Sequence, residues 1–435
     1  MPHTFIAKVR SIACGFLLIG AVATPAAAAN TPLTALQSAI AGQISYAGPH
    51  DGAYAYDLST GQVLFSDRAS ALRPPASVEK LYTATTALEL LGPSTTLSTS
   101  VLGTGHLAPG GVWEGNLYLR GGGDPTFGST AFIRAHYGGE GASVSTLAYD
   151  LVKVDGIHRV TGSIDGDESF LDSLRGEPSS NYEFDPFLEG NLSGLAFNRG
   201  EEGTEHGAHA PAAFAARRLY ATLHADGVSI HGPIGAAPTP PAATLLASVA
   251  SPTISQLVGL MLPPSDNFFA ETLVKDIGRH VTGSGTTAQG AAVVARTIAS
   301  LFGIHPRVVD GSGLSPADKT SPLQVATLLI ALAHTSLGPS LRGEMAVAGR
   351  SGTLELRMRH TAAEGHCQGK TGTLTGVSNL AGYCRSADGH TIVFAVFTDG
   401  INLETAHTVQ DEIAIEIAGS KVSTTEELAA AAHRR

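Results

Sequence analysis

Three short polar motifs occur in order along this 435-residue chain, and their side chains together could attack an amide. Ser77-Val78-Glu79-Lys80 places a hydroxyl and an amine three residues apart, which puts both on one face of a helix. Ser265-Asp266-Asn267 adds a second hydroxyl and a carboxamide, and Lys370-Thr371-Gly372 adds a cation. Each motif alone is weak, but the ordered set predicts acyl transfer through a serine, with a carboxylate held nearby.

Ser77 and Lys80 are predicted to be the nucleophile and its base. Ser77 follows two prolines and opens a helix expected over 77–91, where free backbone N–H groups and the helix dipole favour a developing anion. The alternative is that Ser77 only caps this helix. As a base, Lys80 must lose roughly three units from a pKa of about 10.4, which requires burial. Glu79, beside it, could instead raise that pKa.

The second motif also follows two prolines, so a helix cap is again the alternative to a catalytic role. In the catalytic interpretation, Ser265 passes a proton between Lys80 and the leaving amine. Asn267 then fixes Lys80 and the amide of the substrate through hydrogen bonds.

The third motif lies on a strand expected over 367–373. Lys370 and Thr371 are predicted to hold a carboxylate, although strand alternation sends them to opposite faces. Both can serve one site only if this is an edge strand with the ligand lying along it. Gly372 leaves room for a ligand backbone, and the N–H groups of Thr373 and Ser77 could form an oxyanion hole.

Several other functions are excluded by composition and spacing. The formal net charge of −11, without basic patterning, argues against binding nucleic acid or anionic membranes. Gly369-Lys370-Thr371 matches the tail of a phosphate loop, but Glu364 stands where that motif requires glycine. No set of residues has the spacing of metal ligands, so we expect neither a metal nor another cofactor.

The N-terminus predicts export. Lys8 and Arg10 precede a short apolar segment, 12–22, and Ala26 to Ala29 offer a cleavage site, so residues 1–29 are predicted to be a signal peptide. The alternative is an uncleaved membrane anchor. We expect a periplasmic or secreted protein with no transmembrane anchor after signal removal. Cys367 and Cys384 would then form a disulfide or remain two buried thiols.

The positioning elements divide the chain into two parts. An early hairpin, 53–66, and late strands at 367–373, 380–385 and 392–398 predict a five-stranded antiparallel sheet closed by both ends of the chain. Residues 30–97 and 249–423 are expected to form this catalytic domain. Residues 98–248 are expected to be inserted, β-rich material with a returning linker at 238–243. Residues 424–435 are a predicted tail.

Longer segments extend the motifs: PPASVEKL (74–81), LYLRGGGDPT (117–126), SDNFFAE (265–271), DGSGL (310–314) and GKTGTLTGVSNLAGY (369–383). On these the chain resembles penicillin-binding proteins of the D-alanyl-D-alanine carboxypeptidase/endopeptidase type, peptidase family S13 (low-molecular-mass class C). The resemblance implies an α+β penicilloyl-serine transferase (β-lactamase/transpeptidase-like) fold. It also implies that the domains inserted into this fold lie between the first and second motifs.

The same resemblance implies a serine DD-peptidase that cleaves the D-Ala-D-Ala bond, and D-Ala cross-links, of peptidoglycan stem peptides through an acyl-enzyme on Ser77. β-Lactams would then be covalent inhibitors. The implied roles are Lys80 as base, Ser265 and Asn267 in proton relay and substrate contacts, and Lys370 with Thr371 on the terminal carboxylate.

The sequence leaves two alternative functions open. One is a serine β-lactamase or D-amino-acid amidase or esterase on the same fold. The other is a wall-binding module with an inactive site, suggested by the charged Glu79 next to Lys80.

Overall fold

The computed structural model describes residues 32–200 and 210–422. The predicted signal peptide and the predicted tail lie outside these residues. Within the two described ranges, no helix combines the length and the apolar character needed to cross a membrane.

The motifs are organised by a six-stranded antiparallel sheet in the order β10-β11-β12-β13-β1-β2. Its strands are β1 (Gly52–Asp57), β2 (Gln62–Asp67), β10 (Ala346–Val347), β11 (Cys367–Leu374), β12 (Val377–Arg385) and β13 (Thr391–Asp399). The predicted hairpin and the three predicted C-terminal strands are confirmed. The two-residue β10 is an additional edge strand. Because β13 pairs with β1, both ends of the chain close the sheet, as expected.

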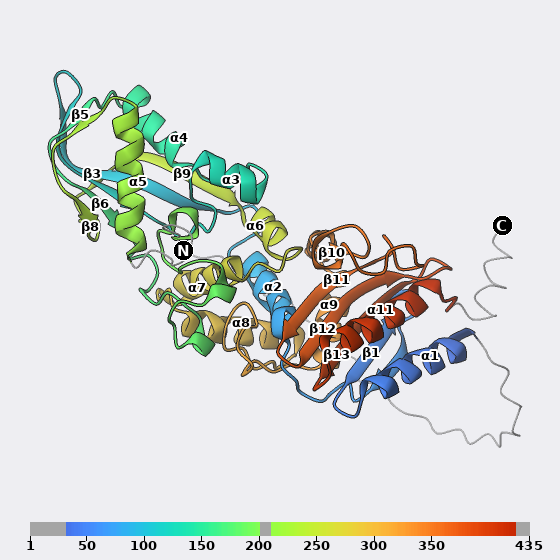
Figure 1. Ribbon diagram of the computed structural model, residues 1–435. Helices are drawn as coiled ribbons and strands as arrows, with labels where there is room; N and C mark the ends of the chain where they lie inside the picture. The colour runs from blue at the N-terminus through green and yellow to red at the C-terminus, as the bar shows by residue number, and fades with distance from the viewer. Residues whose placement is uncertain (1–31, 201–209, 423–435) are drawn as a thin grey trace, which may run out of the picture.

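Helices cover both faces of this sheet (Figure 1). α1 (Pro32–Ala47) and α11 (Leu403–Gly419) pack on one face, and α2 (Lys80–Leu90), α7 (Asn267–Thr282), α8 (Thr287–Phe302) and α9 (Pro322–Ala333) form the core on the other. Successive side chains of the apolar strand β13 point alternately into the two cores. Phe394 and Val396 join the α1–α11 core, whereas Val393 and Phe397 join the α2–α9 core.

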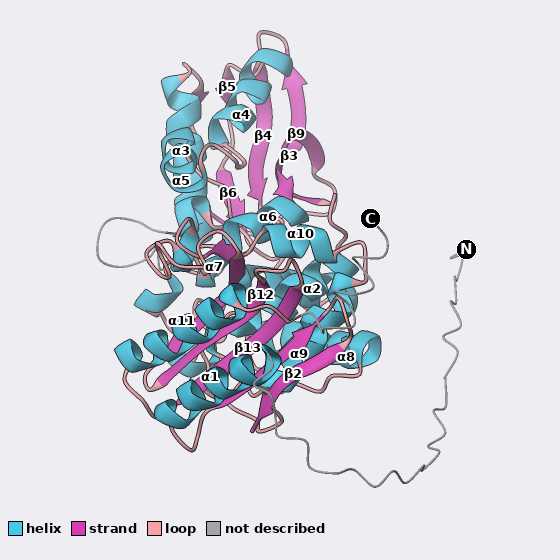
Figure 2. Ribbon diagram, turned by 90° about the vertical axis from the view of Figure 1, so that its right-hand side faces the viewer, coloured by secondary structure: helices cyan, strands magenta, loops and turns pink. Residues whose placement is uncertain are grey.

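A second sheet, of seven strands, lies beside this body (Figure 2). Its strands are β3 (Thr96–Ala108), β4 (Val112–Arg120), β5 (Arg159–Val160), β6 (Ile164–Asp167), β7 (Ser229–Ile230), β8 (Ile234–Ala236) and β9 (Thr244–Thr253). β3 pairs antiparallel with β4 and β9, whereas β4 pairs in parallel with β5 and β6. Three helices lie between the strands of this sheet along the chain: α3 (Thr130–Tyr137), α4 (Val144–Tyr149) and α5 (Pro211–Ala225).

The connections between the two sheets differ in detail from the expected boundaries. β3 begins before residue 98 and β9 ends after residue 248, and Thr96 pairs with Thr253. Segment 238–243 therefore connects β8 to β9 within the second sheet, and the chain returns only where α6 (Ile254–Met261) follows β9. The division into a catalytic and an inserted domain at 98 and 248 stays a prediction.

The two cysteines of the described chain face each other across β11 and β12. Cys367 and Cys384 are register partners in this hairpin and form a disulfide, with both residues buried. Gly376 supplies the left-handed residue of the turn, with φ 76°. The disulfide alternative is therefore confirmed over the two free thiols.

Candidate active site

The nucleophile segment is held in a conformation that local propensity does not favour. Ala76 has φ 47°, in the left-handed region, and is buried. The carboxamide of Asn379 on β12 donates to the carbonyls of Pro74 at 2.9 Å and Pro75 at 2.8 Å. Because these bonds fix the chain just before Ala76, they determine where Ser77 points. Ser77 then lies in a short 3-10 helix, Ala76–Glu79, that leads into α2.

Lys80 reaches Ser77 as expected from their spacing. Its Nζ lies 2.9 Å from Ser77 Oγ, 2.6 Å from Asn267 Oδ1 and 2.8 Å from the Ser312 carbonyl. Two of these partners are carbonyl oxygens that can only accept. An uncharged amine has two N–H groups for them and one lone pair, so its lone pair faces the Ser77 hydroxyl.

Burial shifts the protonation of Lys80 in the direction that a base requires. The side chain is fully buried, and desolvation lowers its pKa to about 8, against the opposing effect of nearby carboxyl groups. At neutral pH about a tenth of the enzyme then carries the free amine. Glu79 is also fully buried, and desolvation raises its pKa well above the ordinary value. Burial therefore disfavours the charged form of Glu79 beside Lys80.

A tight loop behind Lys80 supplies its third partner. Asp310 accepts N–H bonds from Ser312, Gly313 and Ser315 at 2.6 to 3.1 Å, which shapes the loop. Glu271 on α7 accepts from the N–H groups of Gly311 and Ser312. Residue spacing alone assigns no role to this DGSGL segment, yet the backbone carbonyl of Ser312 orients the base.

The second motif delivers its two polar side chains to two different lysines. Asp266 caps α7 by accepting from Phe269 N at 3.0 Å, which confirms the cap expected from sequence. Ser265, before the cap, has φ 67° and its Oγ accepts from Lys370 Nζ at 2.7 Å. Asn267, after the cap, accepts from Lys80. These hydrogen bonds join Ser265 to Lys370, and they join Asn267, rather than Ser265, to Lys80.

Lys370 is a buried lysine that has no carboxylate partner in the described part of the chain. Its Nζ contacts Ser265 Oγ at 2.7 Å and the Thr371 carbonyl at 2.8 Å, and no carboxylate within residues 32–200 or 210–422 forms an ion pair with it. Desolvation, and then the charge of Lys80, lower the pKa of Lys370 well below its usual range. A carboxylate supplied by a ligand would remove this cost.

β11 offers the open edge that Lys370 and Thr371 need in order to act together. β10 pairs only with Gln368 and Gly369, so in the described chain the outer edge of β11 has no strand partner from Lys370 onwards. The Thr371 hydroxyl bonds Thr353 Oγ1 at 2.8 Å. An extended ligand can lie along this edge, which is the condition under which Lys370 and Thr371 can serve one site.

Gly372 has a different neighbour from the one expected. A Cβ at this position would meet the Pro75 carbonyl at 2.5 Å and the Ser77 and Val78 nitrogens at 3.0 Å. The missing side chain therefore admits the nucleophile segment of the protein itself, not a ligand backbone. Gly372 thus lies against Ser77. Thr373, the other expected donor of the oxyanion hole, directly follows Gly372 and is exposed.

The structure also identifies site residues that the sequence did not single out: Asn379, Ser312, Thr353, Arg199 and Phe187. Asn379 lies within the matched GKTGTLTGVSNLAGY segment, and its polar side chain in an otherwise apolar strand was an available signal. Within the described ranges, no group of three or more His, Cys, Asp or Glu side chains is arranged to hold a metal ion.

A serine and a lysine in hydrogen-bond contact, backed by a carboxamide and a second buried lysine on an open strand edge, define a serine acyl-transferring enzyme. A profile of the D-Ala-D-Ala carboxypeptidase 3 (S13) family matches residues 34–184 and 189–419. The chain belongs to this family of serine hydrolases, and the resemblance drawn from the motifs is confirmed.

Individual relatives agree with this assignment. A D-alanyl-D-alanine carboxypeptidase of Actinomadura sp. (strain R39) is 28% identical, covering 92% of this chain and 88% of the relative. Carboxypeptidase DacB of Mycolicibacterium smegmatis is 28% identical, covering 82% and 78%. The crystal structure of penicillin binding protein 4 (dacB) from Haemophilus influenzae superposes with a TM-score of 0.72 at 21% identity, covering 86% of this chain and 97% of that chain. The predicted fold class is confirmed.

Proposed function

We propose that Ser77 is the nucleophile of this S13 carboxypeptidase and attacks the carbonyl of the D-Ala-D-Ala bond in peptidoglycan stem peptides. Lys80 takes the Ser77 proton as Oγ bonds to the carbonyl carbon. The carbonyl oxygen becomes an oxyanion near the N–H groups of Ser77 and Thr373. When this intermediate collapses, the C–N bond breaks and D-Ala leaves with a proton. Water then hydrolyses the acyl-Ser77 ester.

The remaining motif residues orient the peptide. Lys370 and Thr371 hold the terminal carboxylate, and Asn267 donates to a peptide carbonyl of the substrate. Once that carboxylate takes the place of Ser265 on Lys370, the Ser265 hydroxyl is free to pass the proton from Lys80 to the leaving amine. Gly372 keeps β11 against the nucleophile segment. Ser77 and Lys80 act without a metal or other cofactor in this proposal. The observation that carries it is the 2.9 Å contact between Ser77 and the buried amine of Lys80.

β-Lactams should acylate the same serine. A structural neighbour at TM-score 0.52, a predatory endopeptidase from Bdellovibrio bacteriovorus, was crystallised in a form acylated by penicillin G. The family match does not favour a β-lactamase or a D-amino-acid amidase or esterase. The burial of Glu79 disfavours its charged form, which weakens the reason for proposing an inactive wall-binding module.

We further propose that the enzyme acts in the periplasm or after secretion. The Cys367–Cys384 disulfide supports an oxidising compartment. The predicted signal peptide, residues 1–29, would direct the export. An acidic surface fits a partner that is neither nucleic acid nor an anionic membrane.

Two measurements test the function. Benzylpenicillin should add one acyl group to the wild type, and peptide mapping should place it on Ser77. Ser77→Ala should show no adduct, whereas Ser145→Ala, an exposed serine in α4, should be acylated normally. Adduct formation on Ser77→Ala would contradict the proposal.

Digestion of purified muropeptides, monomeric and cross-linked, should release D-Ala from the monomers. Release of monomers from the cross-linked substrate would add the endopeptidase activity. Failure to cut either substrate, with acylation intact, would overturn the assigned substrate.

A further inference from the structure

The carboxamide of Asn267 is occupied at both ends. Its Oδ1 accepts from Lys80 at 2.6 Å, and its Nδ2 donates to the backbone carbonyl of Phe187 at 2.7 Å. Under the proposed function, Nδ2 is the donor that a peptide carbonyl of the substrate requires. The Phe187 carbonyl therefore sits where the carbonyl of a ligand is expected.

Phe187 lies in a small, separately built turn. Asp185 caps the 3-10 segment Pro186–Leu188 by accepting from Phe187 N at 2.8 Å, and Glu189 ends it with φ 61°. The Leu188 side chain is fully buried, whereas the Phe187 side chain is 73% exposed. The turn thus presents one aromatic ring and one carbonyl at the rim of the site.

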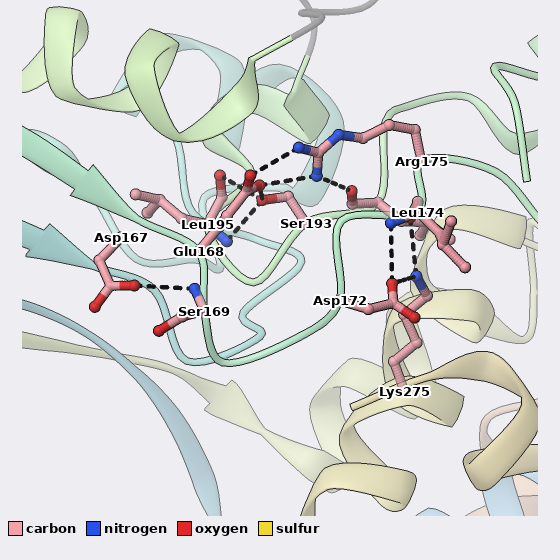
Figure 3. Close-up of polar contacts among 10 residues, drawn as sticks. Asp167, Glu168, Ser169, Asp172, Leu174, Arg175, Ser193, Leu195 and Lys275 are labelled. Atoms are coloured by element: carbon pink, nitrogen blue, oxygen red, sulfur yellow. Dashed lines mark hydrogen bonds and ion pairs between the residues drawn. The ribbon is translucent and has the colours of Figure 1, made fainter. Parts of the chain in front are cut away.

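The segment that carries the turn is fixed at its base (Figure 3). Arg175 pairs with both carboxylate oxygens of Glu168 at 2.7 and 2.8 Å and also donates to the Leu192 carbonyl at 3.0 Å. Lys275 of α7 donates to Asp172 at 2.6 Å and to the Leu174 carbonyl at 2.9 Å. Because these contacts lie on both sides of the turn in sequence, any movement is confined to the residues around Phe187.

Leu188 anchors the turn in the hydrophobic core, whereas the Glu189 end of the turn is tethered weakly. The Glu189 carboxylate contacts Arg199 at 3.3 Å, and the Glu189 side chain is 64% exposed, so this pair contributes little. The same guanidinium is bound firmly elsewhere, because it pairs with the buried Asp266 and donates to the Tyr137 hydroxyl at 2.9 Å. A cavity of about 410 Å³ lies beside Glu189 and Arg199 and gives the turn room to shift.

The turn also falls outside the part of the chain that the family describes. The profile match ends at residue 184 and resumes at residue 189. The four residues between are those of the cap and the 3-10 segment.

We propose that the turn 185–189 is a displaceable gate, in which the Phe187 carbonyl holds the place of the peptide carbonyl of the ligand on Asn267. This rests on the proposed function and names a specificity device of the same site. The ligand class that opens the gate carries an amide carbonyl next to the acylating group. A ligand without that carbonyl reacts with the gate closed.

The test compares two penicillins on a variant with a loosened gate. Benzylpenicillin carries an acylamino carbonyl, and 6-aminopenicillanic acid lacks it. Glu189→Asn removes the contact with Arg199 and suits the left-handed backbone. The matched control, Glu183→Asn, changes an exposed glutamate of the same segment that has no side-chain partner in the described structure.

We expect Glu189→Asn to raise the second-order acylation rate constant of benzylpenicillin about two- to fivefold, the effect of removing one exposed ion pair that holds the gate closed. The rate constant of 6-aminopenicillanic acid, and both rate constants on Glu183→Asn, should not change. Equal gains for both ligands, or no gain for benzylpenicillin, would overturn the gate. Absence of acylation by either ligand on the wild type would instead overturn the proposed function.

The wild-type acyl-enzyme provides a second test that does not depend on a variant. In its crystal structure with benzylpenicillin, Asn267 Nδ2 should bond the acylamino carbonyl and the Phe187 carbonyl should have withdrawn. Since Nδ2 has two hydrogens, a structure in which both carbonyls remain bonded to it would refute the exchange.

Discussion

The core of the seven-stranded sheet and the region around α2 bury very different side chains. The former is built from ordinary apolar residues, among them Leu117, Leu119, Val160, Ile164 and Leu219, all fully buried. The latter buries ionisable groups completely: Glu79, Lys80, Glu271, Asp310 and Lys370. Burying such groups costs folding free energy, and desolvation also shifts the pKa values of Glu79, Lys80, Glu271 and Lys370.

This difference shows where stability and reactivity reside. Desolvation opposes charge on two carboxyl groups near Lys80, since it raises the pKa of Glu79 well above its usual range and that of Glu271 to about 8. The left-handed residues Ala76 and Ser265 add backbone strain in the same region. The second sheet carries no comparable set of buried lysines in its described part. The segment of chain between β6 and α5 contributes Arg199 and the Phe187 turn.

The largest effect should follow from replacing the base. Lys80→Met removes the amine that accepts the Ser77 proton, so acylation by benzylpenicillin should slow by about 10²- to 10⁴-fold. Stopped-flow acylation kinetics measure this, and a thermal melt checks that the variant is folded. A folded variant that reacts at the wild-type rate would assign the base to another group.

Replacing the unpaired cation should have a smaller effect that depends on the ligand. Lys370→Gln removes a charge-assisted hydrogen bond to the terminal carboxylate, so kcat/KM for a D-Ala-D-Ala peptide should fall by roughly 10- to 100-fold. The same peptide with a C-terminal amide should be almost insensitive. Equal losses on both peptides would mean that Lys370 does not bind the carboxylate.

The pH dependence should reflect the lowered pKa of Lys80. Because only the uncharged amine accepts the proton, kcat/KM should rise about tenfold from pH 6 to pH 7 and level off above about pH 8. A rate profile across pH 5 to 9 measures this. A plateau beginning near pH 5 would show that the base titrates much lower than burial of Lys80 predicts.

A cavity in the second sheet should change stability and leave the chemistry intact. Leu219→Ala in α5 should lower the free energy of unfolding by about 2–5 kcal/mol. At a temperature where the variant stays folded, its acylation rate constant should match that of the wild type. Urea unfolding and acylation kinetics on one preparation test both halves, and a large rate loss in the folded variant would show that the two regions are energetically coupled.

Local patterns predicted the strands well because each strand carries its own signal. The hairpin at β1 and β2 and the pairing of β11 with β12 follow from alternation and from turn residues such as Gly61 and Gly376. The two-residue β10 has no such signal. The expected domain boundary at 248 falls inside β9, because Thr244–Thr253 is defined as one strand only by its pairing with β3.

For the candidate site, too, local patterns predicted some features and missed others. Helical spacing alone placed the amine of Lys80 near Ser77, and the order of the motifs predicted that Asn267 and Lys370 would join them. The Ser312 carbonyl, the hydrogen bonds from Asn379 and the turn of Phe187 could not be foreseen, because backbone groups and distant partners leave no mark in a local pattern.

The sequence by itself determined which chemical groups are available: a hydroxyl and an amine one helical turn apart, a strand with a cation, and two cysteines placed symmetrically about a turn. Tertiary structure decided their state. Burial sets whether Lys80 and Lys370 hold their protons, and contacts between residues far apart in the chain determine where Gly372 and Asn267 find their partners. Desolvation and long-range packing depend on the whole fold, and that is the physical reason why residue order alone does not specify them.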